Sequence, residues 1–243
     1  MSPDTLLEHS SGNALDHDFS RRYQVAEHVV VVGKRKLRIS CVKDTNRLLE
    51  EIDPTRFALD ERMPYWAELW TSSVALARHC LEELELEGKS VLELGCGLGL
   101  AGIAAALAGG NVTLTDYEDD ALEFARYNAA RNLPRNVLEK RVSFKNMDWR
   151  SPEGIGTFDV ILGADVVYER SDFTPLLNLL KTALLPGGLV VLTDPDRAIG
   201  RDFFRLAAES GFRVQAQRME VTVESRISSV LRYKLVRGAE GEA

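Results

Sequence analysis

An acid and a phenol stand three residues apart at the end of an apolar run, in the stretch VILGADVVYE at residues 160–169. The acid is Asp165 and the phenol is Tyr168. The apolar half is typical of a strand that is buried on both faces, and the polar half would lie where that strand emerges. A carboxylate can attract an ammonium group and hold an amine for attack, and an aromatic ring can contact a cation. The pair therefore predicts a site that grips an amine.

A second chemical signature is the glycine-rich stretch VLELGCGLGLAG, which follows one expected strand and opens an expected helix. Gly95, Gly97 and Gly99 alternate with Cys96 and Leu98. Glycine allows a tight turn and a close approach of the backbone to a ligand, at the sheet edge where α/β proteins bind ligands. The stretch contains no Lys-Ser or Lys-Thr, which excludes the loop that grips a triphosphate. A tight turn chosen for packing alone is the alternative.

Two acids beside this loop indicate the charge of the ligand. Glu93 lies two residues before Gly95, where a carboxylate would repel a pyrophosphate and suit a cation. Asp116 ends the next expected strand, where an acid can accept hydrogen bonds from ribose hydroxyls. A cationic adenosine compound without phosphate fits both acids, and S-adenosylmethionine is such a compound.

The sequence NMDW ends the third expected strand and adds two candidates for the same ligand. Asp148 could accept a hydrogen bond from the adenine amino group, and Trp149 could lie on the adenine face. A capped turn with a half-buried tryptophan is an equally good interpretation.

Strands alternate with helices from Lys89 onward, which predicts βαβ units, a parallel sheet and helices on both faces. The alternation stops near the C-terminus. There FRVQAQRMEVTV and ISSVLRYKLVRG read as two strands joined by a hairpin-length loop, so the last strand must run antiparallel to the one before it. We expect an α/β, Rossmann-like seven-strand methyltransferase sheet with six parallel strands and one antiparallel C-terminal strand.

The N-terminal part of the chain is expected to form an extension of this sheet. Residues 1–20 are interpreted as a flexible tail, 21–73 as a β-hairpin and helical entrance segment, and 74–243 as the methyltransferase domain. A helix is expected from Pro64 to Gly88, with a Ser-Thr cluster at 71–73 that could split it. On such a helix Trp66 and Trp70, four residues apart, would share a face.

Composition narrows the class of protein. A net charge of -7 argues against a general nucleic-acid binder. Three cysteines without a C-x-x-C pair suit a reducing compartment, and four scattered histidines predict no metal site. The chain shows neither a secretory signal nor an apolar run near the ~18 residues that span a bilayer. A cytoplasmic enzyme or binding protein is therefore expected.

Four segments together resemble the seven-strand protein lysine methyltransferases that carry a D-x-x-Y motif. They are PYWAELW, ELGCGLG with its following Asp116, DW, and FDVILGADVVY, and the likeness runs from about Met63 to Gly211. The resemblance implies S-adenosylmethionine as cofactor and a protein lysine as methyl acceptor. It places Asp165 and Tyr168 near the methyl-transfer point, and it implies that the donor contacts Trp70, Gly95, Cys96, Gly97, Asp116, Trp149 and Ala164.

The stretch TDPDR at residues 193–197 narrows the resemblance further. It is similar to the Asp-Pro-x-Arg segment of the branch that methylates the electron-transfer flavoprotein β-subunit, which would make Asp194 and Arg197 substrate-binding residues. An ordinary Asp-Pro turn is the alternative.

Other functions are compatible with parts of the pattern. A methyltransferase that acts on a small amine would use the same donor site, and a protein that binds the donor without catalysis would need no acid-tyrosine pair. Nucleic-acid methyltransferases often carry Asn-Pro-Pro-Tyr where this chain has Val166 and Val167 between its acid and tyrosine. A nicotinamide oxidoreductase is disfavoured by Glu93 and by the terminal hairpin.

Overall fold

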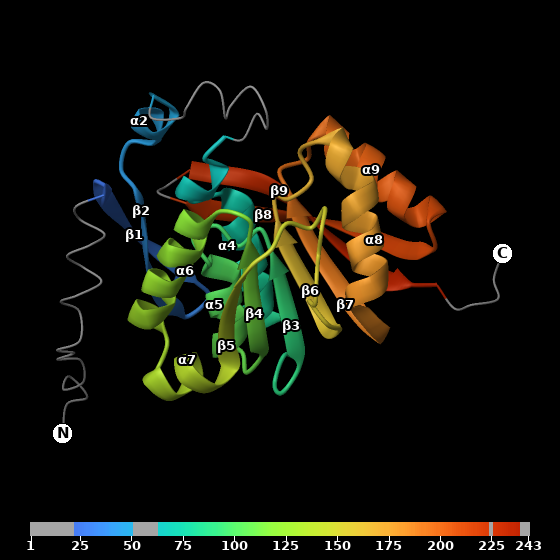
Figure 1. The fold of residues 1–243 in the computed structure, drawn as a ribbon, viewed down its shortest axis with the longest axis horizontal. Coiled ribbons are helices and arrows are strands. Elements are labelled where there is room, and N and C mark those ends of the chain that lie inside the picture. Colours follow the sequence, from blue (N-terminus) through green and yellow to red (C-terminus); the bar gives the residue numbers. More distant parts are fainter. Residues whose placement is uncertain (1–21, 51–62, 224–225, 239–243) are drawn as a thin grey trace.

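A seven-stranded sheet with helices on both faces forms the body of the protein (Figure 1). The computed structural model describes residues 22–50, 63–223 and 226–238. The strand order is β5-β4-β3-β6-β7-β9-β8. The strands are β3 (Ser90–Leu94), β4 (Asn111–Asp116), β5 (Val142–Asn146), β6 (Phe158–Ala164), β7 (Leu184–Asp194), β8 (Phe212–Val223) and β9 (Arg226–Arg237).

The direction of the strands confirms the expected fold. β3 pairs in parallel with both β4 and β6, and β4 with β5 and β6 with β7 are also parallel pairs. β9 lies between β7 and β8 and is antiparallel to both. Six strands therefore share one direction and the C-terminal strand opposes them.

The helices pack on the two faces of the sheet and form one hydrophobic core on each face. The first core contains α4 (Thr71–Glu82), α5 (Leu100–Leu107) and α6 (Asp119–Asn132), and the second contains α8 (Phe173–Ala183) and α9 (Ala198–Glu209). The shorter elements are α2 (Thr45–Glu50), α7 (Arg135–Arg141) and the 3-10 turns η1 (Tyr65–Ala67) and η2 (Arg170–Asp172). No helix within the described ranges is long and apolar enough to cross a bilayer.

The segment before α4 departs from the expected long helix. Pro64 starts a single 3-10 turn, Glu68 is extended, and α4 begins at Thr71 and ends at Glu82. Because α4 begins at Thr71, the Ser-Thr cluster separates it from the 3-10 turn, and the Ser73 hydroxyl donates to the Trp70 carbonyl at 2.7 Å. The expectation that Trp66 and Trp70 share a helix face is therefore wrong. A helix exit at Gly88 is wrong as well.

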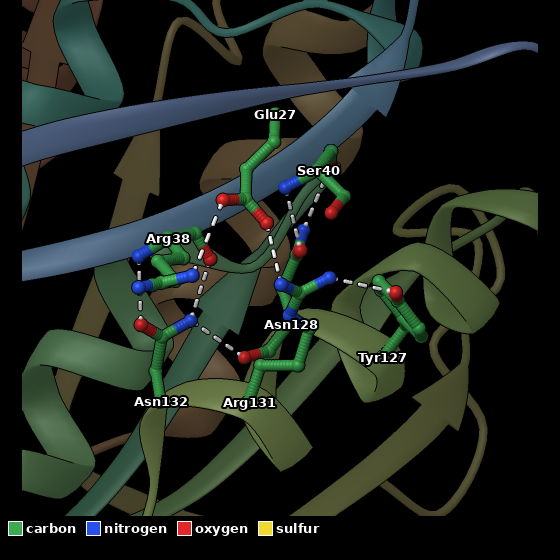
Figure 2. A network of polar contacts seen from close by, with 7 residues as sticks. All are labelled: Glu27, Arg38, Ser40, Tyr127, Asn128, Arg131 and Asn132. Atoms are coloured by element: carbon green, nitrogen blue, oxygen red, sulfur yellow. Dashed lines mark hydrogen bonds and ion pairs between the residues drawn. The ribbon is translucent and has the colours of Figure 1, made fainter. Parts of the chain in front are cut away.

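The expected N-terminal hairpin is present as β1 (Val25–Val32) and β2 (Arg35–Val42), which pair around Gly33-Lys34. Two asparagines of α6, here called the asparagine latch, hold β2 against the sheet domain (Figure 2). Asn128 accepts the Ser40 N–H at 2.8 Å and donates to the Ser40 carbonyl at 3.0 Å. Asn132 makes the same two bonds with Arg38, at 2.8 and 2.7 Å.

The spacing of the asparagine latch follows from backbone geometry. Residues four apart on a helix rise by about 6 Å, and residues two apart on a strand by about 6.6 Å, so two successive amides can match alternate strand residues. The side chain of Asn128 also donates to the carbonyl of Leu98, in the glycine-rich loop, at 3.0 Å. One buried side chain thus connects the hairpin to that loop.

Candidate functional site

A cleft of about 350 Å³ opens where β3, β4 and β6 end at their carboxyl edge. The loops after these strands form its floor, and the segment from Met63 to Ser73 covers one side. The predicted site residues that line it are Trp70, Glu93, Gly95, Cys96, Gly97, Asp116, Trp149, Ala164, Asp165, Tyr168 and Arg197. Most of the predicted site residues therefore meet in one place.

The glycine-rich loop passes close to the entrance segment. Gly97 has a φ of 49°, and a Cβ placed on it would lie 3.3 Å from the carbonyl oxygen of Trp66. Gly95 has a φ of 55°, and a Cβ there would press on Val166 and the ring of Trp149. Both positions need glycine for conformation and for space. Gly99 differs, because it begins α5 and packs against Ala125, outside the residues that line the cleft.

Two buried carboxyl groups stand under this loop. Asp116 accepts the Gly97 N–H at 3.0 Å and the Glu118 N–H at 3.1 Å, and burial raises its pKa to about 6. Burial raises the pKa of Glu93 to about 8, although the Gly102 N–H donates to it and opposes the shift. Its Oε2 has no hydrogen-bond partner within the described chain. A buried carboxyl group with one unpaired oxygen at a cleft wall suits a cationic ligand.

Asp165 occupies the turn directly after β6. It has a φ of 60°, a left-handed conformation that aspartate tolerates better than most residues. Its N–H donates to the Thr193 carbonyl at 2.8 Å, which continues the ladder between β6 and β7 by one residue. The Asp165 side chain is 7% exposed and forms an ion pair with Arg197. The strained turn thus directs a carboxylate into the cleft.

Aromatic rings form the wall beside Asp165. Tyr65 meets Trp70 and Tyr168 edge to face, with ring centroids 6.2 and 5.6 Å apart. The Trp70 indole N–H donates to the Tyr65 carbonyl at 2.7 Å, which fixes its ring. The Tyr168 hydroxyl hydrogen-bonds with Tyr117, and burial raises the pKa of Tyr168 above its usual range. The Tyr168 hydroxyl therefore has Tyr117, another residue of the cleft, as a partner.

The predicted adenine residues have separate surroundings. Trp149 lines the cleft, is buried, and donates its indole N–H to Asp172. Asp148 lies instead in a small neighbouring hollow, where both of its oxygens accept from the Arg150 guanidinium at 2.6–3.0 Å. Its carboxylate is already engaged, so Trp149 is the stronger candidate of the two.

The TDPDR stretch contributes one residue to the cleft and one beneath it. Arg197 lines the cleft, whereas Asp194 is 2% exposed and accepts the Arg197 N–H at 2.7 Å. Trp66 packs on Phe124 with ring centroids 5.4 Å apart and also lines the cleft.

Several lining residues were missed by the sequence reasoning. Tyr117 and Glu118 follow Asp116 directly, so their place at a strand end was a signal that could have identified them. Glu169 follows Tyr168 in the same way. Glu68 offered no local signal, because its place at the cleft depends on the extended backbone between η1 and α4.

Comparison with known proteins relates this cleft to a family. A family model described as lysine methyltransferase matches residues 60–209. The chain is 43% identical over 114 residues to protein N-lysine methyltransferase METTL21A of Xenopus tropicalis, covering 46% of this chain and 52% of that protein. It is 35% identical over 153 residues to the electron transfer flavoprotein beta subunit lysine methyltransferase of Danio rerio, covering 59% and 57%. The chain thus aligns with about half the length of these two relatives.

Solved structures support the fold. The ribosomal protein L11 methylase of Lactobacillus delbrueckii subsp. bulgaricus superposes with a TM-score of 0.55 at 18% identity, covering 87% of this chain and 98% of that one. The resemblance seen in the motifs is confirmed by the family match, and the family implies S-adenosylmethionine as cofactor. Because that match spans more than half of its residues, the chain belongs to the lysine methyltransferase family.

Proposed function

We propose that the protein transfers a methyl group from S-adenosylmethionine to the side-chain nitrogen of a lysine in a protein substrate. The observation that carries this proposal is Asp165, a nearly buried carboxylate that faces the cleft beside the glycine-rich loop and an aromatic wall. A carboxylate next to aromatic rings recognises an ammonium group on an unbranched chain.

The donor half of the cleft fits S-adenosylmethionine. Gly97 lets the glycine-rich loop pass close to the Trp66 backbone beside the cleft because it lacks a Cβ, and the unpaired Glu93 oxygen suits the positive groups of the donor. Asp116 keeps lone pairs for ribose hydroxyls, since each of its oxygens can accept more than one hydrogen bond. We assign adenine stacking to Trp149 and closing contacts to Trp70. When bound, the donor supplies an electrophilic methyl group on its sulfonium sulfur.

In the acceptor half of the cleft, Asp165 acts as a positioning group. Lysine has an ordinary pKa near ~10.4 and must lose a proton before its nitrogen lone pair can form the new N–C bond. A neighbouring carboxylate raises the pKa of an amine and so opposes that loss. Asp165 therefore contributes by attracting the ammonium and by holding the remaining N–H groups so that the lone pair faces the methyl group. The rings of Tyr65 and Tyr168 wall the path and exclude water.

Methyl transfer into proteins tests this function directly. Purified protein and radiolabelled S-adenosylmethionine are added to a lysate of cells that lack the gene, and labelled bands are separated by electrophoresis. We expect one or a few labelled proteins, with the label on lysine after acid hydrolysis, and none with the Asp165→Ala variant. Label confined to the small-molecule fraction would replace the proposal with a small-amine methyltransferase. Absence of label in both fractions would leave a donor-binding protein.

The place of action is part of the same proposal. We propose a cytoplasmic enzyme that acts on a protein rather than on nucleic acid. Cys80 and Cys96 are buried thiols, as in a reducing compartment, and the net charge is -7. Fluorescence microscopy of a tagged full chain would test the location.

A further inference from the structure

The carboxylate that should receive the substrate is already paired. A guanidinium nitrogen of Arg197 forms an ion pair with Asp165 Oδ1, and neither of these two atoms has another hydrogen-bond partner within the described residues. The Arg197 side chain is 35% exposed, whereas that of Asp165 is 7% exposed. Arg197 can therefore leave the contact more easily than Asp165 can.

A second carboxylate lies within reach of the same guanidinium. Asp194 Oδ2 is 4.0 Å from Arg197 Nη1, is buried, and has no hydrogen-bond partner among the described residues. Its Oδ1 accepts the backbone N–H of Arg197 at 2.7 Å, which fixes the distance between the two residues. The other nearby acid, Asp196, already pairs with Arg201 and Arg218. Of these two acids, Asp194 is therefore the one with an oxygen available to bind the Arg197 guanidinium.

Charge determines what can happen when a lysine arrives. A nearly buried carboxylate without a partner is costly, so Arg197 compensates Asp165 as long as the acceptor site is empty. A substrate ammonium beside Asp165 would lie close to the guanidinium, and in this nearly buried place the two cations repel each other. The repulsion favours the departure of one cation, and the more exposed Arg197 has Asp194 to move toward.

We propose that Arg197 is a displaceable gate: it occupies Asp165 in place of the substrate ammonium and moves to Asp194 when a lysine side chain enters. The proposal rests on the proposed function for the identity of that cation. Arg197 is then a positioning and selectivity residue rather than a ligand of the substrate. Only a cation can exchange with the guanidinium, so neutral or acidic side chains are rejected at Asp165.

Steady-state kinetics distinguish a gate from the alternatives. A dilution series of one gene-deleted lysate gives KM in relative units, which suffices for ratios between variants. We expect Arg197→Gln to lower KM about three- to tenfold, because the substrate no longer competes with a tethered cation. Arg197→Lys should fall between the wild type and Arg197→Gln. Arg201 lies four residues after Arg197 and pairs with Asp196, so Arg201→Gln, which removes the same charge, should leave KM within about twofold.

Two kinetic outcomes would overturn the gate. A KM that rises in Arg197→Gln would make Arg197 a substrate ligand. A kcat that falls at constant KM would give it a structural role only.

Nuclear magnetic resonance tests the gate without turnover, so failure of the gate can be told from failure of the proposed function. The guanidinium resonance of Arg197 is assigned by its loss in Arg197→Lys and followed in the full chain with S-adenosylhomocysteine. We expect n-butylammonium, a mimic of the lysine side chain, to shift this resonance and n-butanol to leave it unchanged. In Asp165→Asn the resonance should no longer respond. A wild-type resonance that ignores saturating n-butylammonium refutes the gate, whether or not lysate proteins are methylated.

Discussion

Two polar clusters that both contact the glycine-rich loop are built in opposite ways. In the asparagine latch, the buried amide of Asn128 has backbone partners on both its oxygen and its nitrogen. In and beneath the cleft, Asp165 and Arg197 form an ion pair, and one oxygen each of Glu93 and Asp194 is buried without a hydrogen-bond partner in the described chain. The latch uses neutral groups on fixed backbone, and the cleft uses charges on side chains.

The difference separates stability from function. A buried polar group that is fully hydrogen-bonded contributes to one defined structure, and removing it leaves its partners unpaired. A buried ionisable group whose hydrogen bonds are incomplete costs stability and persists where a ligand completes them. Substitutions in the latch should therefore mainly destabilise the protein, and substitutions in the cleft should mainly change binding and turnover.

The largest effect is expected for Asp165→Ala. The loss of the positioning carboxylate should lower kcat/KM for the protein acceptor at least about 10³-fold. Donor affinity by calorimetry should stay within several-fold, and the thermal midpoint should not fall, because Arg197 is partly exposed and can turn to solvent. Unchanged turnover would remove Asp165 from the catalytic site, and a large loss of stability would erase the contrast with the latch.

The next effect concerns stability alone. Asn128→Ala leaves the Ser40 N–H, the Ser40 carbonyl and the Leu98 carbonyl without this partner, so the free energy of unfolding in urea should fall by about 2–4 kcal/mol. Asn132→Ala, whose bonds to Arg38 lie in exposed surroundings, should cost about 1 kcal/mol. If both variants lose the same free energy of unfolding, burial does not determine how much each asparagine of the latch stabilises the protein.

A smaller effect is expected where the entrance segment meets the donor loop. Gly97→Ala places a Cβ 3.3 Å from the Trp66 carbonyl oxygen and should weaken S-adenosylmethionine binding about tenfold by calorimetry. Gly88→Ala is the matched control, because its φ of 73° carries the same backbone strain but its Cβ meets nothing within 4 Å. If both variants bind the donor as the wild type does, the loop does not contact it closely.

The smallest effect is a dependence of donor affinity on pH. Glu93, with a pKa near 8, and Asp116, with a pKa near 6, are both raised by burial, so they ionise as the pH rises through this window. Affinity for the cationic S-adenosylmethionine should rise about fivefold from pH 6 to 8, because carboxylates then replace neutral acids. S-adenosylhomocysteine lacks the sulfonium charge and should show a weaker trend in the same titrations.

The stability of the donor-free protein should decrease as the pH rises, whereas the donor affinity increases. A carboxyl group whose pKa is raised in the folded state destabilises that state once ionised. The ordinary pKa of a glutamate is 4.5, and that of Glu93 in the folded protein is about 8. The free energy of unfolding should therefore fall as the pH rises from 4.5 to about 8. Urea unfolding across this range, with Glu93→Gln as the variant that should flatten the dependence, checks the sign.

The sequence predicted best what depends on local pattern. Alternating strands and helices specified the sheet, and Asp116 and Asp165 could be placed at the cleft because parallel strands end at one edge. The path of residues 63–73 could not be predicted in the same way, because a 3-10 turn and an extended residue interrupt the expected helix. Glu68 was missed for that reason.

Contacts between residues far apart in the sequence also could not be predicted. The Arg197 contact with Asp165 joins side chains 32 positions apart, and the bond from Asn128 to Leu98 joins two elements that no local motif connects. Both depend on how the elements pack. The bond between Arg150 and Asp148 is local in the sequence. Residue type alone still could not show whether the Asp148 carboxylate binds adenine or pairs with a neighbouring side chain.

The position of β9 has a consequence for biosynthesis. β8 has no neighbour in the sheet other than β9, and β9 is made last of all the strands in the described chain. While the ribosome still holds residues 226–237, the edge of β7 is open and β8 has no ladder to join. The nascent chain therefore exposes unpaired strand edges until β9 has left the ribosome, and such edges can pair with other chains in that interval.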